Sequence, residues 1–234
     1  MMSSSVPAAP AQRSGATLHS IEIAGPAGRL EGILNEGSAD APYAALICHP
    51  HPSGGGSLHN KVVYHAMKAL NAPEFGLGWP VLRFNFRGTG RSQGTHDGRA
   101  EAEDVLAALR WLEAECKRPV AVVGFSFGAA MALMACCGAR AEHPDVRALV
   151  ALGLPIQAEG HTYRYSFLSG CTLPKLFVSG DRDAFAPADD LKRVTATTAE
   201  PKTLVLLPGA DHFFAGQLET MQNAVAGWLK EQLP

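Results

Sequence analysis

Residues 121–130 read AVVGFSFGAA, a strand-like run that turns directly into a helix-like run. The apolar residues before Gly124 are typical of a buried strand, and the small residues after Gly128 are typical of a helix. A turn this sharp leaves no space for side chains two residues before and two residues after the central serine, and glycine meets that requirement. Ser126 is therefore predicted to lie at a helix N-terminus, where backbone N–H groups stabilise developing negative charge.

Strand-like and helix-like segments alternate on both sides of this turn. Strands are predicted over 18–24 and 29–34, which form a hairpin, and over 43–48, 81–86, 146–152, 175–179 and 202–207. Helices are predicted after the capping residue Asn60, over 99–116, from Ser126 to Gly138, and around the apolar face of Leu218, Met221, Val225 and Trp228. This alternation predicts an α/β fold with a mostly parallel sheet covered by helices on both faces.

The length of the chain, 234 residues, suits one large α/β domain. Residues 1–16 are rich in Ser, Ala and Pro and contain no apolar stretch of the kind that signal peptides have. We therefore expect a disordered tail over 1–16 and a single domain over 17–234.

The composition argues against several classes of partner. Apolar residues make up 47% of the chain, charged residues make up 18%, and the net charge is −2. This balance provides no basic surface for phosphates, so no nucleic-acid partner is expected. No apolar run has the length of a membrane span, so no membrane contact is expected. The five cysteines are odd in number and lack CxxC spacing, which predicts free thiols in a reducing compartment and a cytoplasmic protein.

A nucleophilic serine needs a base and a carboxylate that orients the base. His212 is the predicted base, because it lies in a glycine-containing loop after the last strand. Among the carboxylates, Asp211 is its neighbour in sequence and should point away from it. Asp181 comes directly after a strand and should bind backbone N–H groups of its own turn. Asp183 lies two residues further along, where a side chain reaches a neighbouring loop, so we predict Asp183 as the acid with Asp181 as the main alternative.

Residues 49–56 read HPHPSGGG and form a loop after the strand at 43–48. Because proline has no N–H, His51 carries the backbone donor between two prolines. This donor and the N–H of Phe127 are predicted to bind the oxyanion of a tetrahedral intermediate. Gly54 and Gly55 would let the loop approach the substrate, or they form only a flexible turn. No carboxylate is suitably spaced to complete a metal site with the loop histidines, so no metal is expected.

The segment between Pro155 and Pro174 is too short for an inserted lid domain but long enough for a functional loop. Two of its aromatic residues, Tyr163 and Tyr165, have two possible roles. They wall a substrate pocket, or they pack beneath the loop. The sequence favours neither.

The order Ser126, Asp183, His212, with the strand context of the serine, resembles the α/β-hydrolase superfamily. The motifs HPHP at 49–52 and GADHFF at 209–214 are similar to those of small bacterial hydrolases without a lid, which are related to dienelactone hydrolases and to the catalytic domains of prolyl oligopeptidases. This resemblance implies a twisted sheet of about eight strands with one antiparallel strand near an edge. It also implies hydrolysis of carboxylic esters.

Two departures narrow the expected activity. Ser126 stands where dienelactone hydrolases carry cysteine, which counts against lactone substrates. The sequence also lacks the propeller domain that controls the entry of peptides in prolyl oligopeptidases, which counts against oligopeptidase activity. The expectation is a serine hydrolase that cleaves small-molecule carboxylic esters of small to medium acyl groups without a cofactor. A thioesterase or amidase on the same residues, or a non-catalytic binding protein of the same fold, are the alternatives. A monomer and a homodimer are both compatible with the sequence.

Overall fold

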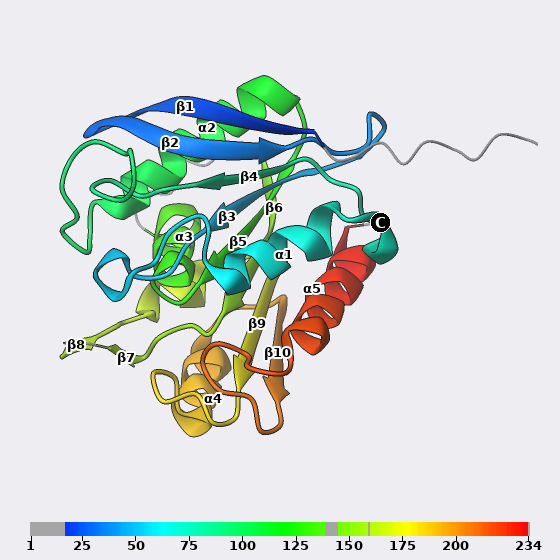
Figure 1. Cartoon of the computed structure of the whole chain (residues 1–234). Helices are drawn as coiled ribbons and strands as arrows, with labels where there is room; N and C mark the ends of the chain where they lie inside the picture. The colour runs from blue at the N-terminus through cyan, green and yellow to red at the C-terminus, as the bar shows by residue number, and fades with distance from the viewer. Residues whose placement is uncertain (1–16, 139–144, 159, 234) are drawn as a thin grey trace, which may run out of the picture.

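The computed structural model describes residues 17–138, 145–158 and 160–233. An eight-stranded sheet runs through the molecule in the order β1-β2-β4-β3-β5-β6-β9-β10 (Figure 1). The strands are β1 (Leu18–Gly25), β2 (Gly28–Asn35), β3 (Ala44–Cys48), β4 (Val81–Phe84), β5 (Val120–Phe125), β6 (Val146–Leu152), β9 (Lys175–Gly180) and β10 (Lys202–Leu207). Strand β2 is antiparallel to both of its neighbours, whereas all pairs from β4 to β10 are parallel. The expected α/β sheet, with one antiparallel strand near an edge, is confirmed.

Helices cover both faces of the sheet, as Figure 1 shows. Helices α1 (Lys61–Asn71) and α5 (Leu218–Gln232) pack on one face, and α2 (Glu101–Cys116), α3 (Phe127–Cys137) and α4 (Ala188–Thr197) pack on the other. The central strands β3, β5 and β6 have apolar side chains on both faces, which only a sheet covered twice can bury. The predicted cap is confirmed, because the Asn60 side chain accepts hydrogen bonds from the first turn of α1.

Some short elements were not predicted. Helix α4 has the sequence ADDLKRVTAT, in which Leu191 and Val194 are the only large apolar residues. Strands β7 (Gln157–Ala158) and β8 (His161–Thr162) form a separate hairpin of two residues each, too short for an alternating pattern. The 3₁₀ helices η1 (Pro52–Gly54), η2 (Pro73–Phe75) and η3 (Ser166–Gly170) lie within connecting segments.

Residues 1–16 lie outside the described part of the chain, so the predicted tail and the single-domain assignment stay predictions. None of the described helices combines the length and the apolar character that crossing a membrane requires.

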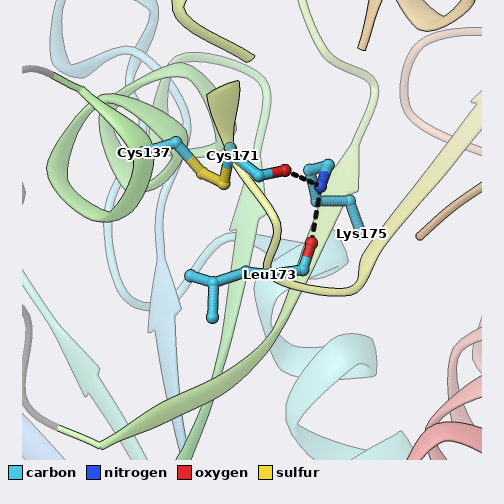
Figure 2. The surroundings of a disulfide bond; sticks show 4 residues. All are labelled: Cys137, Cys171, Leu173 and Lys175. Atoms are coloured by element: carbon cyan, nitrogen blue, oxygen red, sulfur yellow. Dashed lines mark hydrogen bonds between the residues drawn. A yellow bond between two sulfur atoms is a disulfide. The ribbon is translucent and has the colours of Figure 1, made fainter. Parts of the chain in front are cut away.

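The expectation that all five cysteines are free thiols is wrong for two of them. Cys137 and Cys171 form a disulfide with Cα atoms 5.3 Å apart, while Cys48, Cys116 and Cys136 are free. The bond joins the C-terminal end of α3 to the end of η3 (Figure 2). Packing of η3 against α3 brings the two sulfur atoms together, and no sequence motif signals that packing. The cysteines therefore no longer support a reducing compartment, and the cytoplasmic location stays a prediction.

The chain after the disulfide is also held by a buried lysine. Figure 2 shows the ammonium group of Lys175 between two carbonyl oxygens. It donates to the carbonyl of Cys171 at 2.6 Å and to that of Leu173 at 2.5 Å. The disulfide and the lysine together fix the end of the loop that contains β7 and β8.

Breaking this disulfide is expected to lower the free energy of unfolding. The bond closes a loop with a sequence separation of 34 residues, for which the chain-entropy relation gives about 3–4 kcal/mol. Cys137→Ser and dithiothreitol-treated wild type should both show this loss in urea denaturation. Cys116→Ser is the matched control and should behave as wild type. A wild-type urea midpoint that dithiothreitol does not move would contradict the prediction.

Candidate active site

Ser126 lies at the sharp turn between β5 and α3. Its φ angle of 54° is in the left-handed region, which a non-glycine residue rarely adopts. A Cβ atom at Gly124 would lie 2.4 Å from the Cα of Ala129, and one at Gly128 would lie 2.3 Å from the carbonyl oxygen of Cys48. The requirement for both glycines, inferred from the sequence, is therefore confirmed. The turn presents the Ser126 hydroxyl above the carboxyl end of the sheet.

Loops after β5, β9 and β10 bring Ser126, Asp183 and His212 together. The Ser126 Oγ lies 3.0 Å from Nε2 of His212, and Nδ1 of His212 lies 2.8 Å from Oδ2 of Asp183. A carboxylate only accepts hydrogen bonds, so Nδ1 of the imidazole carries the proton and donates to Asp183. Nε2 is left with its lone pair and accepts the hydroxyl proton of Ser126. This arrangement can deprotonate the serine when it attacks an electrophile.

Asp183 is buried and held on both carboxylate oxygens. Its Oδ1 accepts from the backbone N–H groups of Phe185 at 2.8 Å and Ala186 at 3.1 Å, and its Oδ2 also accepts from the Ser179 hydroxyl at 3.1 Å. Burial raises the pKa of Asp183, but the hydrogen bond and the charge of His212, with the backbone and Ser179 donors, lower it more. The net pKa lies below the ordinary 3.8, so this carboxyl group is ionised at neutral pH.

The two competing carboxylates are exposed and bind backbone groups. Oδ1 of Asp181 accepts from the N–H of Gly209 at 2.7 Å, and thereby ties the loop after β9 to the loop after β10. Oδ1 of Asp211 accepts from the N–H groups of Phe213 and Ala215. In the described structure, the hydrogen bonds and the ion pair of the His212 imidazole with a carboxylate involve Asp183 and neither of these two residues.

The two loop histidines at 49 and 51 have different surroundings. His49 is fully buried; its Nδ1 donates to the carbonyl of Pro50 at 2.7 Å and its Nε2 accepts from the N–H of Phe86 at 3.0 Å. Burial lowers the pKa of His49 to about 4, so the ring is neutral and acts as a structural support. His51 instead faces the cavity beside Ser126. Within the described residues, no three His, Cys, Asp or Glu side chains gather as metal ligands.

A small cavity of about 110 Å³ opens at Ser126 and His212. Its walls are largely apolar, and the remaining lining residues are Pro50, His51, Gly54, Asn60, Phe127, Ala158, Tyr163, Phe185 and Phe213. Of the predicted pocket residues, Gly54 and Tyr163 therefore line it. Gly55 and Tyr165, both within the described part of the chain, do not. Tyr165 packs beneath the loop and its hydroxyl donates to the carbonyl of Pro155 at 2.6 Å.

Several residues that shape the site were missed by the sequence analysis. Gly153 follows β6 with a φ of 52°, and a Cβ atom there would lie 3.1 Å from the ring of His212. The rings of Phe185 and Phe213 pack against the same imidazole, with centroids 4.6 Å and 5.2 Å from it. The sequence did contain a signal for the two phenylalanines, because Phe185 lies two residues after the predicted acid and Phe213 directly follows the predicted base.

A larger surface cavity of about 870 Å³ lies elsewhere, beside β2 and the C-terminal half of α1. None of Ser126, Asp183 and His212 lines it, so we assign the chemistry to the smaller cavity.

Comparison with known proteins agrees with this architecture. A protein-family model described as an alpha/beta hydrolase domain matches residues 44–227 of this chain. An uncharacterized protein of Rickettsia prowazekii is 35% identical over 213 residues, which cover 88% of this chain and 86% of the relative. The solved structure of an alpha-beta serine hydrolase homologue from Coxiella burnetii is 34% identical with a TM-score of 0.78, and the match covers 90% of this chain and 97% of that one. A serine hydrolase without a lid from Xanthomonas campestris is 29% identical with a TM-score of 0.77, over 98% and 99% of the two chains. The chain belongs to the alpha/beta hydrolase family.

Proposed function

We propose that this protein is a serine hydrolase that cleaves carboxylic esters of small to medium acyl groups. The observation that carries the proposal is the continuous hydrogen-bonded chain from Asp183 through His212 to Ser126, which ends at the apolar cavity. The serine hydrolase homologues from Coxiella burnetii and Xanthomonas campestris support the same class of reaction.

The reaction has two halves. Oγ of Ser126 attacks the ester carbonyl carbon while its proton moves to Nε2 of His212. The tetrahedral intermediate then breaks its bond to the alcohol oxygen, which takes the proton from the imidazolium. A water molecule, deprotonated by the same Nε2, then attacks the carbonyl carbon of the acyl-enzyme. The second tetrahedral intermediate breaks its bond to Oγ, releases the acid, and Oγ takes the proton back from the imidazolium. Asp183 remains ionised and holds the imidazole in the required tautomer.

The oxyanion of each intermediate is assigned to two backbone donors, the N–H groups of Phe127 and His51. As the first residue of α3, Phe127 has no acceptor for its N–H within the helix. His51 lines the cavity on the side of the loop after β3. Donors fixed before the reaction contribute to catalysis because they need no reorganisation when charge develops.

The cavity favours small acyl groups. Its volume of about 110 Å³ is below the usual range for drug-sized ligands, and phenyl and imidazole rings make up much of its wall. Matched oxygen ester, thioester and amide substrates of one short acid distinguish the esterase from the alternative activities. Faster turnover of the thioester or of the amide than of the oxygen ester would identify the protein as a thioesterase or an amidase.

Labelling with a fluorophosphonate tests the proposal directly. The reagent should phosphonylate wild-type protein at Ser126, identified by peptide mass spectrometry, and His212→Ala should label far more slowly because the hydroxyl keeps its proton. His59→Ala, at an exposed position outside the cavity, is the matched control and should label as wild type. Folded wild-type protein that does not label would favour a non-catalytic binding protein.

A further inference from the structure

Three aromatic rings form a cluster behind the proposed oxyanion site. His96, in the segment between β4 and α2, packs edge-on against His51 and against Phe127, with ring centroids 4.7 Å and 5.3 Å away. The rings of His51 and Phe127 also contact each other, at 5.0 Å. His96 therefore touches the side chains of both residues whose backbone N–H groups are assigned to the oxyanion.

Two hydrogen bonds and one close polar contact connect Ser53, His51, His96 and Glu101. The N–H of Ser53 donates to Nδ1 of His51 at 3.2 Å, so a neutral His51 carries its proton on Nε2. That nitrogen lies 3.4 Å from Nε2 of His96, which must then be the acceptor. The proton of a neutral His96 is then on Nδ1, which lies 2.7 Å from Oε1 of Glu101 in a close polar contact that lacks hydrogen-bond geometry. For neutral rings, the direction of the Ser53 donor thus indicates one tautomer for each histidine.

Glu101 is buried next to His96 and is held by a backbone hydrogen bond. It is fully buried at the start of α2, and its Oε1 accepts from the N–H of Asp97 at 2.9 Å, whereas its Oε2 has no hydrogen-bond partner among the described residues. A carboxylate in the first turn of a helix is stabilised by the helix dipole, and a buried one needs hydrogen-bond donors.

His51 in turn holds the shape of its loop. Its side chain caps η1 through the Ser53 N–H, and its carbonyl accepts from the N–H groups of Gly54 at 3.1 Å and Gly56 at 3.0 Å. A rotation of the His51 ring would disturb the cap, and with it the direction of the His51 backbone N–H.

We propose that His96 and Glu101 are positioning residues for the oxyanion site. Glu101 orients His96, and His96 fixes His51 by a hydrogen bond and Phe127 by packing. The inference rests on the proposed function, because it assigns the two backbone donors to an oxyanion. Donors must lie within about 2.7–3.1 Å of the oxyanion, so a small rotation of the loop weakens transition-state binding more than substrate binding.

His96→Phe separates hydrogen bonding from packing, since phenylalanine keeps an aromatic ring but lacks both nitrogens. We expect kcat for p-nitrophenyl acetate to fall about 10-fold to 100-fold with KM unchanged, below the 10²–10³-fold loss for a missing donor. The inhibition constant of a short alkyl trifluoromethyl ketone, whose adduct with Ser126 carries an oxyanion, should rise by a similar factor. The matched control is His19→Phe, which removes an exposed histidine of β1 that is paired with Glu36.

Variants of Glu101 test the positioning role independently if His96→Phe does not fold. Glu101→Gln keeps an oxygen that can accept from the Asp97 N–H and lie beside Nδ1 of His96, and it should retain most of the wild-type kcat, whereas Glu101→Leu should lose as much as His96→Phe. Wild-type kcat and ketone inhibition in His96→Phe, or in Glu101→Leu, would overturn the positioning role while leaving the proposed function intact. A wild-type protein without esterase activity and without Ser126 labelling would overturn both.

Discussion

Ser126→Ala is expected to lower kcat for p-nitrophenyl acetate by on the order of 10⁶-fold. The alanine variant has no oxygen to form an acyl-enzyme, so His212 and the backbone donors can act only on a direct attack by water. Binding and the backbone donors are expected to leave a residual rate about 10³–10⁴-fold above that of the reaction in water. Steady-state kinetics with highly purified protein measure the loss.

Two controls connect this loss to the nucleophile. The melting temperature of Ser126→Ala should stay close to that of wild type, because alanine and serine have the same backbone requirement at a φ of 54°. Ser169→Ala changes an exposed serine of η3 and should keep wild-type turnover. Turnover near the wild-type level in Ser126→Ala would show that another group performs the attack.

The position of Ser126 at a sharp strand-to-helix turn could be predicted from the sequence because the constraint on it is local. The turn from β5 into α3 needs glycine at two positions within five residues, and both glycines are visible in the motif. The placement of Asp183 and His212 beyond the ends of neighbouring strands followed from a general property of parallel sheets, whose carboxyl ends share one edge. Local turn geometry and strand alternation were therefore enough to bring the three residues together in the interpretation.

Contacts between irregular segments could not be predicted in this way. His51 and His96 are separated by 45 positions and lie in loops without a periodic pattern. The disulfide between Cys137 and Cys171 depends on how a short 3₁₀ helix packs against α3, and neither spacing nor composition indicates that packing. Similarly, the space that Gly153 leaves for the imidazole is visible only when β6 and the loop after β10 are placed together.

Asp183→Asn is expected to lower kcat by about 10⁴-fold, since the wrong imidazole tautomer would be stabilised. Two backbone N–H groups donate to Oδ1 of Asp183, so the amide oxygen of asparagine takes that position and the amide nitrogen faces His212. An N–H donor there requires an unprotonated Nδ1, which moves the imidazole proton to Nε2. Nε2 can then no longer accept the proton of Ser126.

Asp181→Asn is the matched control for this substitution, two residues away in the same loop. Its amide oxygen can still accept from the N–H of Gly209, so turnover should stay within about 3-fold of wild type, as for other surface changes of small energetic effect. Parallel kcat measurements on both variants decide between the two carboxylates. The opposite ranking, with Asp181→Asn more damaging, would assign the acid to Asp181. Because Asp181 does not contact His212 in the described structure, the loop after β9 would then have to rearrange during catalysis.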